Sequence, residues 1–147
     1  MKHLVYLGIG IVVTIVFFIL SCSDGFNIYE QLFFNQGYND KMFNLNMYPV
    51  IAAITIGLAW GGAAIYYYAI NSVRFDRWWH WLAVMAVTVV LTPVACYLVA
   101  QAMLSGMDYA HEAVQFQFYN LAVVAVLYVV ASFSIKWWSS NCRHSPF

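Results

Sequence analysis

The chain is poor in charge: 8% of its 147 residues are charged, 64% are hydrophobic, and the formal net charge is zero. An ordinary soluble domain carries about 25% charged residues. A soluble core of this length could not bury so much apolar surface, whereas helices exposed to lipid can present it. The composition therefore excludes an ordinary soluble domain. It predicts an integral membrane protein, with the lipid bilayer as a partner. The zero net charge gives no indication of nucleic acid as a partner.

Ionisable side chains are also missing from the middle of four long apolar runs, at residues 4–20, 50–69, 82–100 and 121–135. Such side chains are costly at membrane depth, so where they occur they usually mark the pathways of pumps, channels and transporters. Their absence argues against proton or ion transport by a single copy of the chain. It leaves open a pore that several copies line together.

Cysteine and histidine are too few and too scattered for the common redox sites of small membrane proteins. The three cysteines are Cys22, Cys96 and Cys142, and the lack of a Cys-x-x-Cys pair argues against a thiol oxidase. A membrane haem takes axial ligands at helix depth, and no histidine lies within an apolar run. We therefore expect no cofactor and no enzymatic activity.

What the chain does contain is apolar runs that approach or exceed the roughly 20 residues that a helix needs to cross a bilayer. Inside lipid a segment must satisfy its own backbone hydrogen bonds, which favours helix even where β-branched residues are common. We predict transmembrane helices at residues 4–21, 48–70, 78–103 and 118–138, outer loops at 22–47 and 104–117, and a tail at 139–147. The predicted fold is an all-α integral membrane protein, a single domain formed by a four-helix transmembrane bundle in up-down-up-down order.

The signs of the charges divide between the two sides of this predicted bundle. The N-terminus, the connection between the second and third helices, and the C-terminal region carry Lys2, Arg74, Arg77, Lys136 and Arg143. The two outer loops carry Asp24, Glu30, Asp40, Asp108 and Glu112, and only Lys41 and Asp76 depart from the pattern. Because cytoplasmic loops are enriched in Lys and Arg, both termini are predicted to be cytoplasmic. The lack of Asn-x-Ser/Thr acceptors in the outer loops fits a bacterial inner membrane.

The first apolar run has two interpretations. The residues Ile19-Leu20-Ser21-Cys22 resemble a lipoprotein cleavage box, after which Cys22 would be lipidated. The run at 4–20 is longer than the apolar core of a usual signal peptide and long enough to span a bilayer. We therefore favour an uncleaved membrane anchor.

Small residues and one proline mark the predicted helix contacts. Gly57 and Gly61 form a small-xxx-small pair on the second predicted helix, next to Gly62. Such a pair lets two helix backbones approach closely, either within one chain or between chains. Pro93 removes one backbone hydrogen bond from the third predicted helix and is expected to kink it.

The first outer loop is not simply hydrophilic. If residues 27–34 are helical, Ile28, Leu32, Phe33 and Phe34 share one apolar face. Such a helix would lie in the headgroup layer, and the alternative is that Phe33 and Phe34 dock on a partner protein. An aromatic belt is predicted at the same level, formed by Tyr29, Tyr38, Phe43 and Tyr48.

The tail at residues 139–147 is a second predicted docking segment. It is too short to fold alone, and such ends commonly fray. Arg143, Pro146 and Phe147 nevertheless supply a charge, a rigid turn and an apolar anchor, a combination suited to a groove on a partner. Both interpretations of the tail, a frayed end and a docked segment, stay open.

One metal site is conceivable in the second outer loop. Asp108, His111 and Glu112 lie within about one helical turn, so they can share a face. A metal would need further ligands from another element, such as the acidic residues of the first outer loop. A solvated, charge-patterned loop is the more economical interpretation.

Three functions fit these patterns. The leading hypothesis is a non-enzymatic structural or anchoring subunit of a larger envelope-embedded assembly, such as a secretion or injection apparatus, with other membrane proteins as partners. The alternative is a homo-oligomeric channel or small-solute transporter whose path is lined by Thr14, Thr55, Thr88 and Thr92. A metal-dependent membrane enzyme that uses His111 and its acidic neighbours is the second alternative.

Overall fold

The computed structural model describes residues 1–70, 77–104 and 109–139, and over these ranges the chain is helical and contains no strand. In chain order the elements are α1 (Lys2–Cys22), α2 (Ile28–Leu32), α3 (Gln36–Asn44), α4 (Met47–Ala64), η1 (Ile65–Ala69), α5 (Trp78–Met103), α6 (Ala110–Ile135) and η3 (Lys136–Trp138). Four of the predicted site residues lie outside the described residues, namely Asp108, Arg143, Pro146 and Phe147.

Among the described residues, four helical segments are long and apolar enough to cross a membrane: Lys2–Cys22, Met47–Ala69, Trp78–Met103 and Ala110–Trp138. The second segment continues α4 into a π-helical turn, η1, and the fourth continues α6 into a 3-10 turn, η3. The prediction of an all-helical protein with four candidate membrane spans is confirmed. This architecture is compatible with an integral membrane protein.

The helix α6 begins at Ala110, about two helical turns before the start predicted at Phe118. The prediction placed the start where the apolar run begins. Residues 110–117 are rich in Ala, Glu and Gln, which are good helix formers, and Glu112 interacts favourably with the helix dipole in the first turn. The predicted outer loop at 104–117 is therefore wrong for residues 110–117. The earlier start places Gln117 and Asn120 well inside the helix.

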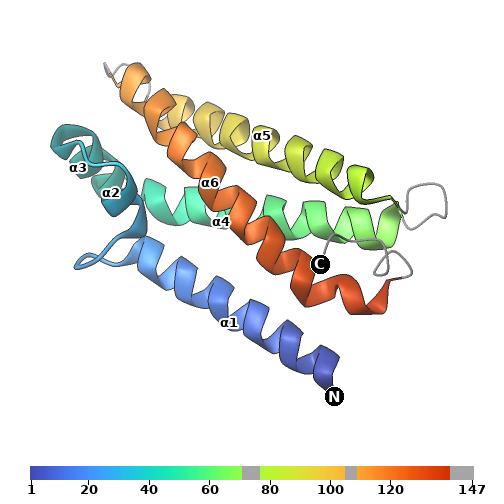
Figure 1. Ribbon diagram of the computed structural model, residues 1–147. Helices are drawn as coiled ribbons and strands as arrows, with labels where there is room; N and C mark the ends of the chain where they lie inside the picture. The colour runs from blue at the N-terminus through green and yellow to red at the C-terminus, as the bar shows by residue number, and fades with distance from the viewer. Residues whose placement is uncertain (71–76, 105–108, 140–147) are drawn as a thin grey trace.

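The first outer loop folds into two short helices, α2 and α3, which lie at one end of the long helices (Figure 1). Each begins at an asparagine cap, the type of residue that best satisfies the free N–H groups of a first turn. Asn27 Oδ1 accepts a hydrogen bond from the Tyr29 N–H at 3.0 Å, and Asn35 Oδ1 accepts one from the Tyr38 N–H at 3.2 Å. Because α2 ends at Leu32, the helix predicted over residues 27–34 is wrong at its C-terminal end.

Three tyrosines predicted for an interfacial belt are instead buried at this end of the bundle. Tyr29, Tyr38 and Tyr48 are each at most 1% exposed, whereas Phe43 is 40% exposed. The rings of Tyr29 and Tyr48 stack at a centroid distance of 6.0 Å, and both contact Phe116 of α6. The belt prediction is therefore wrong for these three tyrosines. Because α2 and α3 fold back over the helix ends, the rings of Tyr29 and Tyr38 join that of Tyr48 on α4 and supply the apolar surface that closes the core.

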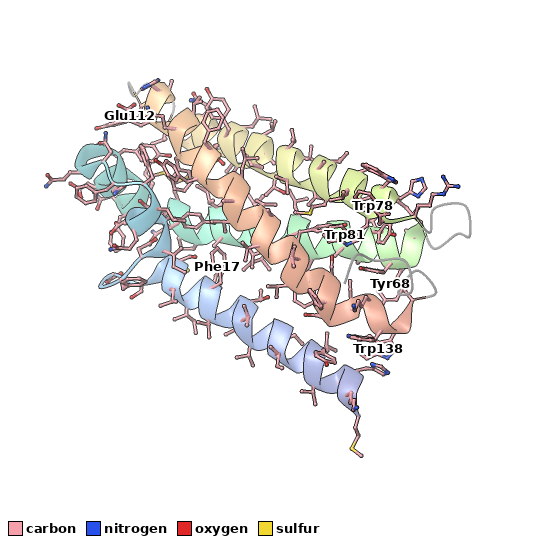
Figure 2. All side chains as sticks on the ribbon, viewed as in Figure 1. Phe17, Tyr68, Trp78, Trp81, Glu112 and Trp138 are labelled. Carbon is pink, nitrogen blue, oxygen red and sulfur yellow. The ribbon has the colours of Figure 1, made fainter. Side chains whose placement is uncertain are left out.

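The opposite end of the bundle also gathers aromatic side chains, among them the labelled Tyr68, Trp81 and Trp138 (Figure 2). The Tyr68 hydroxyl donates to the Ile135 carbonyl oxygen at 2.8 Å. Trp81 Nε1 donates to Ser132 Oγ at 3.2 Å. These two bonds join η1 and α5 to the last turns of α6.

Two helix contacts are close because a glycine faces a hydroxyl side chain. Gly10 of α1 packs on Ser134 of α6, and Gly62 of α4 packs on Thr88 of α5. A Cβ atom at either glycine would collide with the facing side chain, so only glycine permits the observed approach.

Gly57 and Gly61 face open space instead. A Cβ built on either residue would meet no heavy atom within 4 Å outside its own helix. The close approach predicted at this pair is therefore not made within the described part of the chain and stays a prediction for contact between chains. Pro93 is buried inside α5, which continues unbroken through it.

Candidate functional site at Asn120

Asn120 lies in α6, and its side chain is fully buried. A buried carboxamide is destabilising unless its N–H donors and its carbonyl oxygen find partners. Buried residues of α6 around it recur every three or four positions, at Ala113, Gln117, Asn120 and Val124. This spacing places the amide on the helix face that meets the other helices.

The Asn120 carboxamide bonds two side chains of other elements and one of its own helix. The Tyr29 hydroxyl of α2 donates to Asn120 Oδ1 at 3.3 Å. Asn120 Nδ2 donates to Gln117 Oε1 at 3.3 Å and to Thr55 Oγ1 of α4 at 3.5 Å. All three partners are buried. One amide therefore connects α2 and α4 to α6.

Cys96 of α5 extends this set of contacts. Its Sγ atom lies 3.8 Å from Thr55 Oγ1, a distance at which either atom can be the donor. Both side chains are fully buried. We refer to Tyr29, Thr55, Cys96, Gln117 and Asn120 as the Asn120 cluster, which draws its members from α2, α4, α5 and α6.

A second set of hydrogen bonds holds α2 and α3 beside the Asn120 cluster. Asn27 Nδ2 donates to the Ser21 carbonyl oxygen at the end of α1, at 2.8 Å. Asn39 of α3 accepts from the Tyr48 hydroxyl at 3.1 Å and donates to the Phe33 carbonyl oxygen at 3.4 Å. Asn27 and Asn39 are both buried. Asn27 and Asn39 thus act as internal connectors between helices.

Burial keeps the phenols of α2 and α3 neutral. Burial raises the pKa of Tyr29 above its ordinary value of 10.0, and the nearby Thr55 hydroxyl opposes this effect only in part. Burial, and secondarily the Glu112 carboxylate, raises the pKa of Tyr38. The Asn120 cluster contains no carboxylate, ammonium, guanidinium or imidazole group. It is suited to fixing helices in place or to hydrogen bonding a neutral group.

The two predicted metal ligands that the structure describes, His111 and Glu112, are not members of the Asn120 cluster. His111 is exposed, and its Nε2 lies 3.1 Å from Gln115 Nε2. Glu112 is half-buried, while Asp108 lies outside the described residues. In residues 1–70, 77–104 and 109–139, no group of three or more His, Cys, Asp or Glu side chains could hold a metal ion. Metal binding at the full three-residue candidate stays a prediction.

The two residues of the predicted docking pair, Phe33 and Phe34, differ in burial. Phe33 packs inward, with its ring centroid 5.9 Å from that of Tyr38 and 5.8 Å from that of Tyr119. Phe34 is 78% exposed. Of the pair, only Phe34 presents its ring to the surroundings in the described part of the chain.

The threonines assigned to a channel path are engaged inside a single copy. Thr55 and Thr92 are fully buried, and Thr88 is 6% exposed. The hydroxyls of Thr88 and Thr92 each donate to the carbonyl oxygen four residues earlier at 2.8 Å. Thr14 Oγ1 accepts from Trp60 Nε1 at 3.1 Å. These hydroxyls are used in contacts within the bundle rather than on a surface that several copies could share.

The prediction from sequence missed Asn120 as a polar residue at depth. The predicted helix starts at Phe118 and its apolar run covers residues 121–135, so Asn120 falls just outside that run. A usable signal was present, since Ala113, Gln117, Asn120 and Val124 follow the helical period of 3.6 residues. No comparable signal identified Tyr29, because its inward direction depends on how α2 folds back.

Comparison of the chain with known proteins gives no match: no family model, no curated protein and no solved structure matches it. The function is therefore argued from the residues and their geometry.

Proposed function

We propose that the chain is a non-enzymatic structural or anchoring subunit of a larger envelope-embedded membrane assembly, of the kind that a secretion or injection apparatus contains. The observation that carries this proposal is a strip of small residues on α4, formed by Ala53, Gly57 and Gly61 at intervals of four residues. The strip is exposed or half-buried, and an added Cβ at either glycine meets no heavy atom within 4 Å outside its own helix. Nothing in the described part of the chain uses this strip for packing.

An apolar groove of about 390 Å³ runs between α4 and α5 beside the strip. Leu58 and Gly61 line its α4 side, and Val87 and Leu91 line its α5 side. In lipid, helices associate where small residues let their backbones approach, because burial of apolar surface gives little driving force there. We propose that the occupant is a transmembrane helix of another subunit, lying along the strip with its side chains in the groove.

The polar groups inside the bundle support a structural role. The Asn120 cluster connects four elements without a charged group, and the threonine hydroxyls are engaged in contacts within the chain. A channel formed by several copies has less support, since three of its four proposed lining residues, Thr55, Thr88 and Thr92, are buried within one copy.

The proposal includes an orientation: an up-down-up-down bundle with both termini cytoplasmic, in a bacterial inner membrane. The N-terminus of α1 and the end of α6 lie away from α2 and α3 (Figure 1). The end that carries α2 and α3 has three acidic residues of the first outer loop, Asp24, Glu30 and Asp40. Lys2 and Lys136 lie in the first turn of α1 and in η3. This charge difference supports a cytoplasmic position for the basic end.

The test compares three glycine variants in native membranes. Gly57→Ile and Gly61→Ile are expected to reduce copurification of partner subunits several-fold, because a branched side chain holds a partner backbone away from the strip. Gly8→Ile is the matched control, since Gly8 of α1 also has no heavy atom within 4 Å of an added Cβ. It should leave copurification unchanged. The readout is quantitative mass spectrometry after gentle solubilisation and affinity purification.

A photocrosslinking amino acid at Leu58 identifies what fills the groove. An adduct with a different membrane protein, lost in Gly61→Ile but kept in Gly8→Ile, is the expected result. A lone monomer after gentle solubilisation contradicts the proposal. An adduct with a second copy also contradicts it and favours a homo-oligomer, whose channel activity is then measured as solute flux into liposomes.

A further inference from the structure

A second apolar groove, of about 290 Å³, lies between α5 and α6. Pro93 and Val94 line its α5 side, and Val114 and Phe118 line its α6 side. Val94, Val114 and Phe118 are 49%, 42% and 67% exposed, so the groove opens along the side of the bundle. Its lining includes one carboxamide, that of Gln117.

Gln117, which lines this groove, carries an amide donor that no described residue pairs. Its side chain is 6% exposed, and its Nε2 atom has no hydrogen-bond acceptor among the described residues. The orientation of the amide follows from its neighbours, because Asn120 Nδ2 donates to Gln117 Oε1 and the Tyr29 hydroxyl donates to Asn120 Oδ1. A buried donor without an acceptor is strongly destabilising. An acceptor from outside the chain would remove that penalty.

We propose that this groove binds one acyl chain of a membrane glycerolipid and that the ester carbonyl of that chain accepts a hydrogen bond from Gln117 Nε2. The apolar walls suit a hydrocarbon chain, and the neutral amide donor of Gln117 suits a neutral acceptor at its end. A water molecule is a poorer occupant, because a buried water needs two to four polar partners. A hydrocarbon chain without a carbonyl would fill the groove but leave the donor unpaired.

The depth of Gln117 supports an ester group in particular. The helix α6 is about 39 Å long, whereas the hydrocarbon core of a bilayer is about 30 Å thick. Gln117 lies about 10 Å from the start of α6, which is about 5 to 6 Å inside the hydrocarbon boundary when the helix is centred in the bilayer. Glycerolipid ester groups lie at that boundary, within reach of a long side chain. This inference requires a membrane position for α6 but not membership of a larger assembly.

The test uses the full chain in nanodiscs of phosphatidylethanolamine that contain a small amount of a photoactivatable lipid. That lipid carries a diazirine on one acyl chain and is supplied in an ester-linked form and in an ether-linked form that lacks the carbonyl. The ester form is expected to label the groove residues of α5 and α6 about three- to tenfold more than the ether form, the effect of one neutral hydrogen bond. Labelled positions are located by mass spectrometry.

Two variants test separately the contribution of the apolar groove and that of the Gln117 donor to lipid labelling. Val94→Phe fills the groove and leaves Gln117 intact, so labelling by the ester lipid should fall. The matched control is Val126→Phe, at another exposed valine outside the groove, on α6, which should leave labelling unchanged. Gln117→Met removes the donor at similar length and should make the two lipids label equally.

The Gln117 variant also removes an acceptor from Asn120, so its unfolding temperature is measured alongside. The Val94→Phe result does not depend on that bond. Equal labelling by the two lipids in the unmodified chain overturns the proposal. Labelling by the ester lipid that persists in Val94→Phe overturns it as well.

Discussion

Asn120 accepts a hydrogen bond from Tyr29 and donates to Gln117 and Thr55, and all four side chains are buried. Hydrogen bonds between transmembrane helices contribute about 0.6 kcal/mol on average and about 1.7 kcal/mol at most. Removal of one buried partner also leaves the remaining groups unsatisfied, which costs about 1–3 kcal/mol. A residue with three such partners should therefore matter more to stability than an exposed amide on the same helix.

Asn120→Leu is expected to lower the free energy of unfolding by about 2 kcal/mol, because the Tyr29 hydroxyl and the Thr55 hydroxyl lose a partner in an apolar interior. The matched control is Gln115→Leu, which removes an exposed amide from the same helix and should change the free energy by less than about 0.5 kcal/mol. Equilibrium unfolding in detergent micelles, followed by circular dichroism, measures both.

A double-mutant cycle separates the Tyr29 contact from general damage to the core. Tyr29→Phe should destabilise the unmodified chain more than it destabilises the Asn120→Leu chain, in which its hydrogen-bond partner is already gone. Strictly additive effects would show that the two side chains do not interact energetically, and the assignment of Asn120 as the centre of the cluster would then fail.

Side-chain direction is the part of the candidate site that sequence patterns predicted least well. Tyr29, Tyr38 and Tyr48 fit an interfacial belt by composition, yet all three rings face the core. A tyrosine has an apolar body and a polar tip, so it suits either position. The choice depends on the path of α2 and α3, which is set by tertiary contacts such as the bond from Tyr48 to Asn39.

At the scale of elements, the long helices could be predicted and the short ones could not. The length of an apolar run is dictated by bilayer thickness, so α1, α5 and the span formed by α4 and η1 begin and end within a few residues of the predicted bounds. The helices α2 and α3 have fewer than ten residues each and depend on caps and on contacts with the bundle. The polar start of α6 was missed because the apolar pattern that predicts a span is weaker there.

The helix α1 shows how narrow a helix contact can be. Within α1, all of which the structure describes, the buried residues are Gly10 and Ser21. Gly10 packs on Ser134 of α6, whereas Gly8, one half-turn away, faces open space. The hydrogen bond from Trp60 to Thr14 lies about one turn beyond Gly10. The attachment of α1 to the bundle therefore depends strongly on the missing Cβ at one glycine.

Gly10→Leu is expected to lower the free energy of unfolding by about 1–3 kcal/mol, because overpacking pushes α1 away from α6. Gly8→Leu makes the same chemical change in open space and should alter that free energy by less than about 0.5 kcal/mol. Hydrogen exchange of the α1 backbone should rise in Gly10→Leu alone. Equal effects of the two variants would contradict the assignment of Gly10 as the packing position.

At the scale of the whole molecule, the two ends of the bundle differ in chemistry. The end with α2 and α3 is closed by buried tyrosines and has acidic side chains at its surface. The opposite end carries tryptophans, and the Lys136 ammonium lies 4.6 Å from the ring centroid of Trp137. Aromatic side chains gather at both headgroup layers, whereas basic side chains are enriched on the cytoplasmic side, so Lys2 and Lys136 at this end support the proposed orientation.

That orientation predicts which surface cysteines react in intact cells. In a background with Cys22→Ser and Cys142→Ser, Cys96 is fully buried and should stay unlabelled by a membrane-impermeant maleimide. Asn44→Cys, at an exposed position of α3, should be labelled in intact bacteria or their spheroplasts. His3→Cys, exposed in the first turn of α1, should be labelled only after permeabilisation, because the proposed orientation places that end in the cytoplasm. The reverse pattern would invert the orientation, and labelling of both sites before permeabilisation would contradict a cytoplasmic N-terminus.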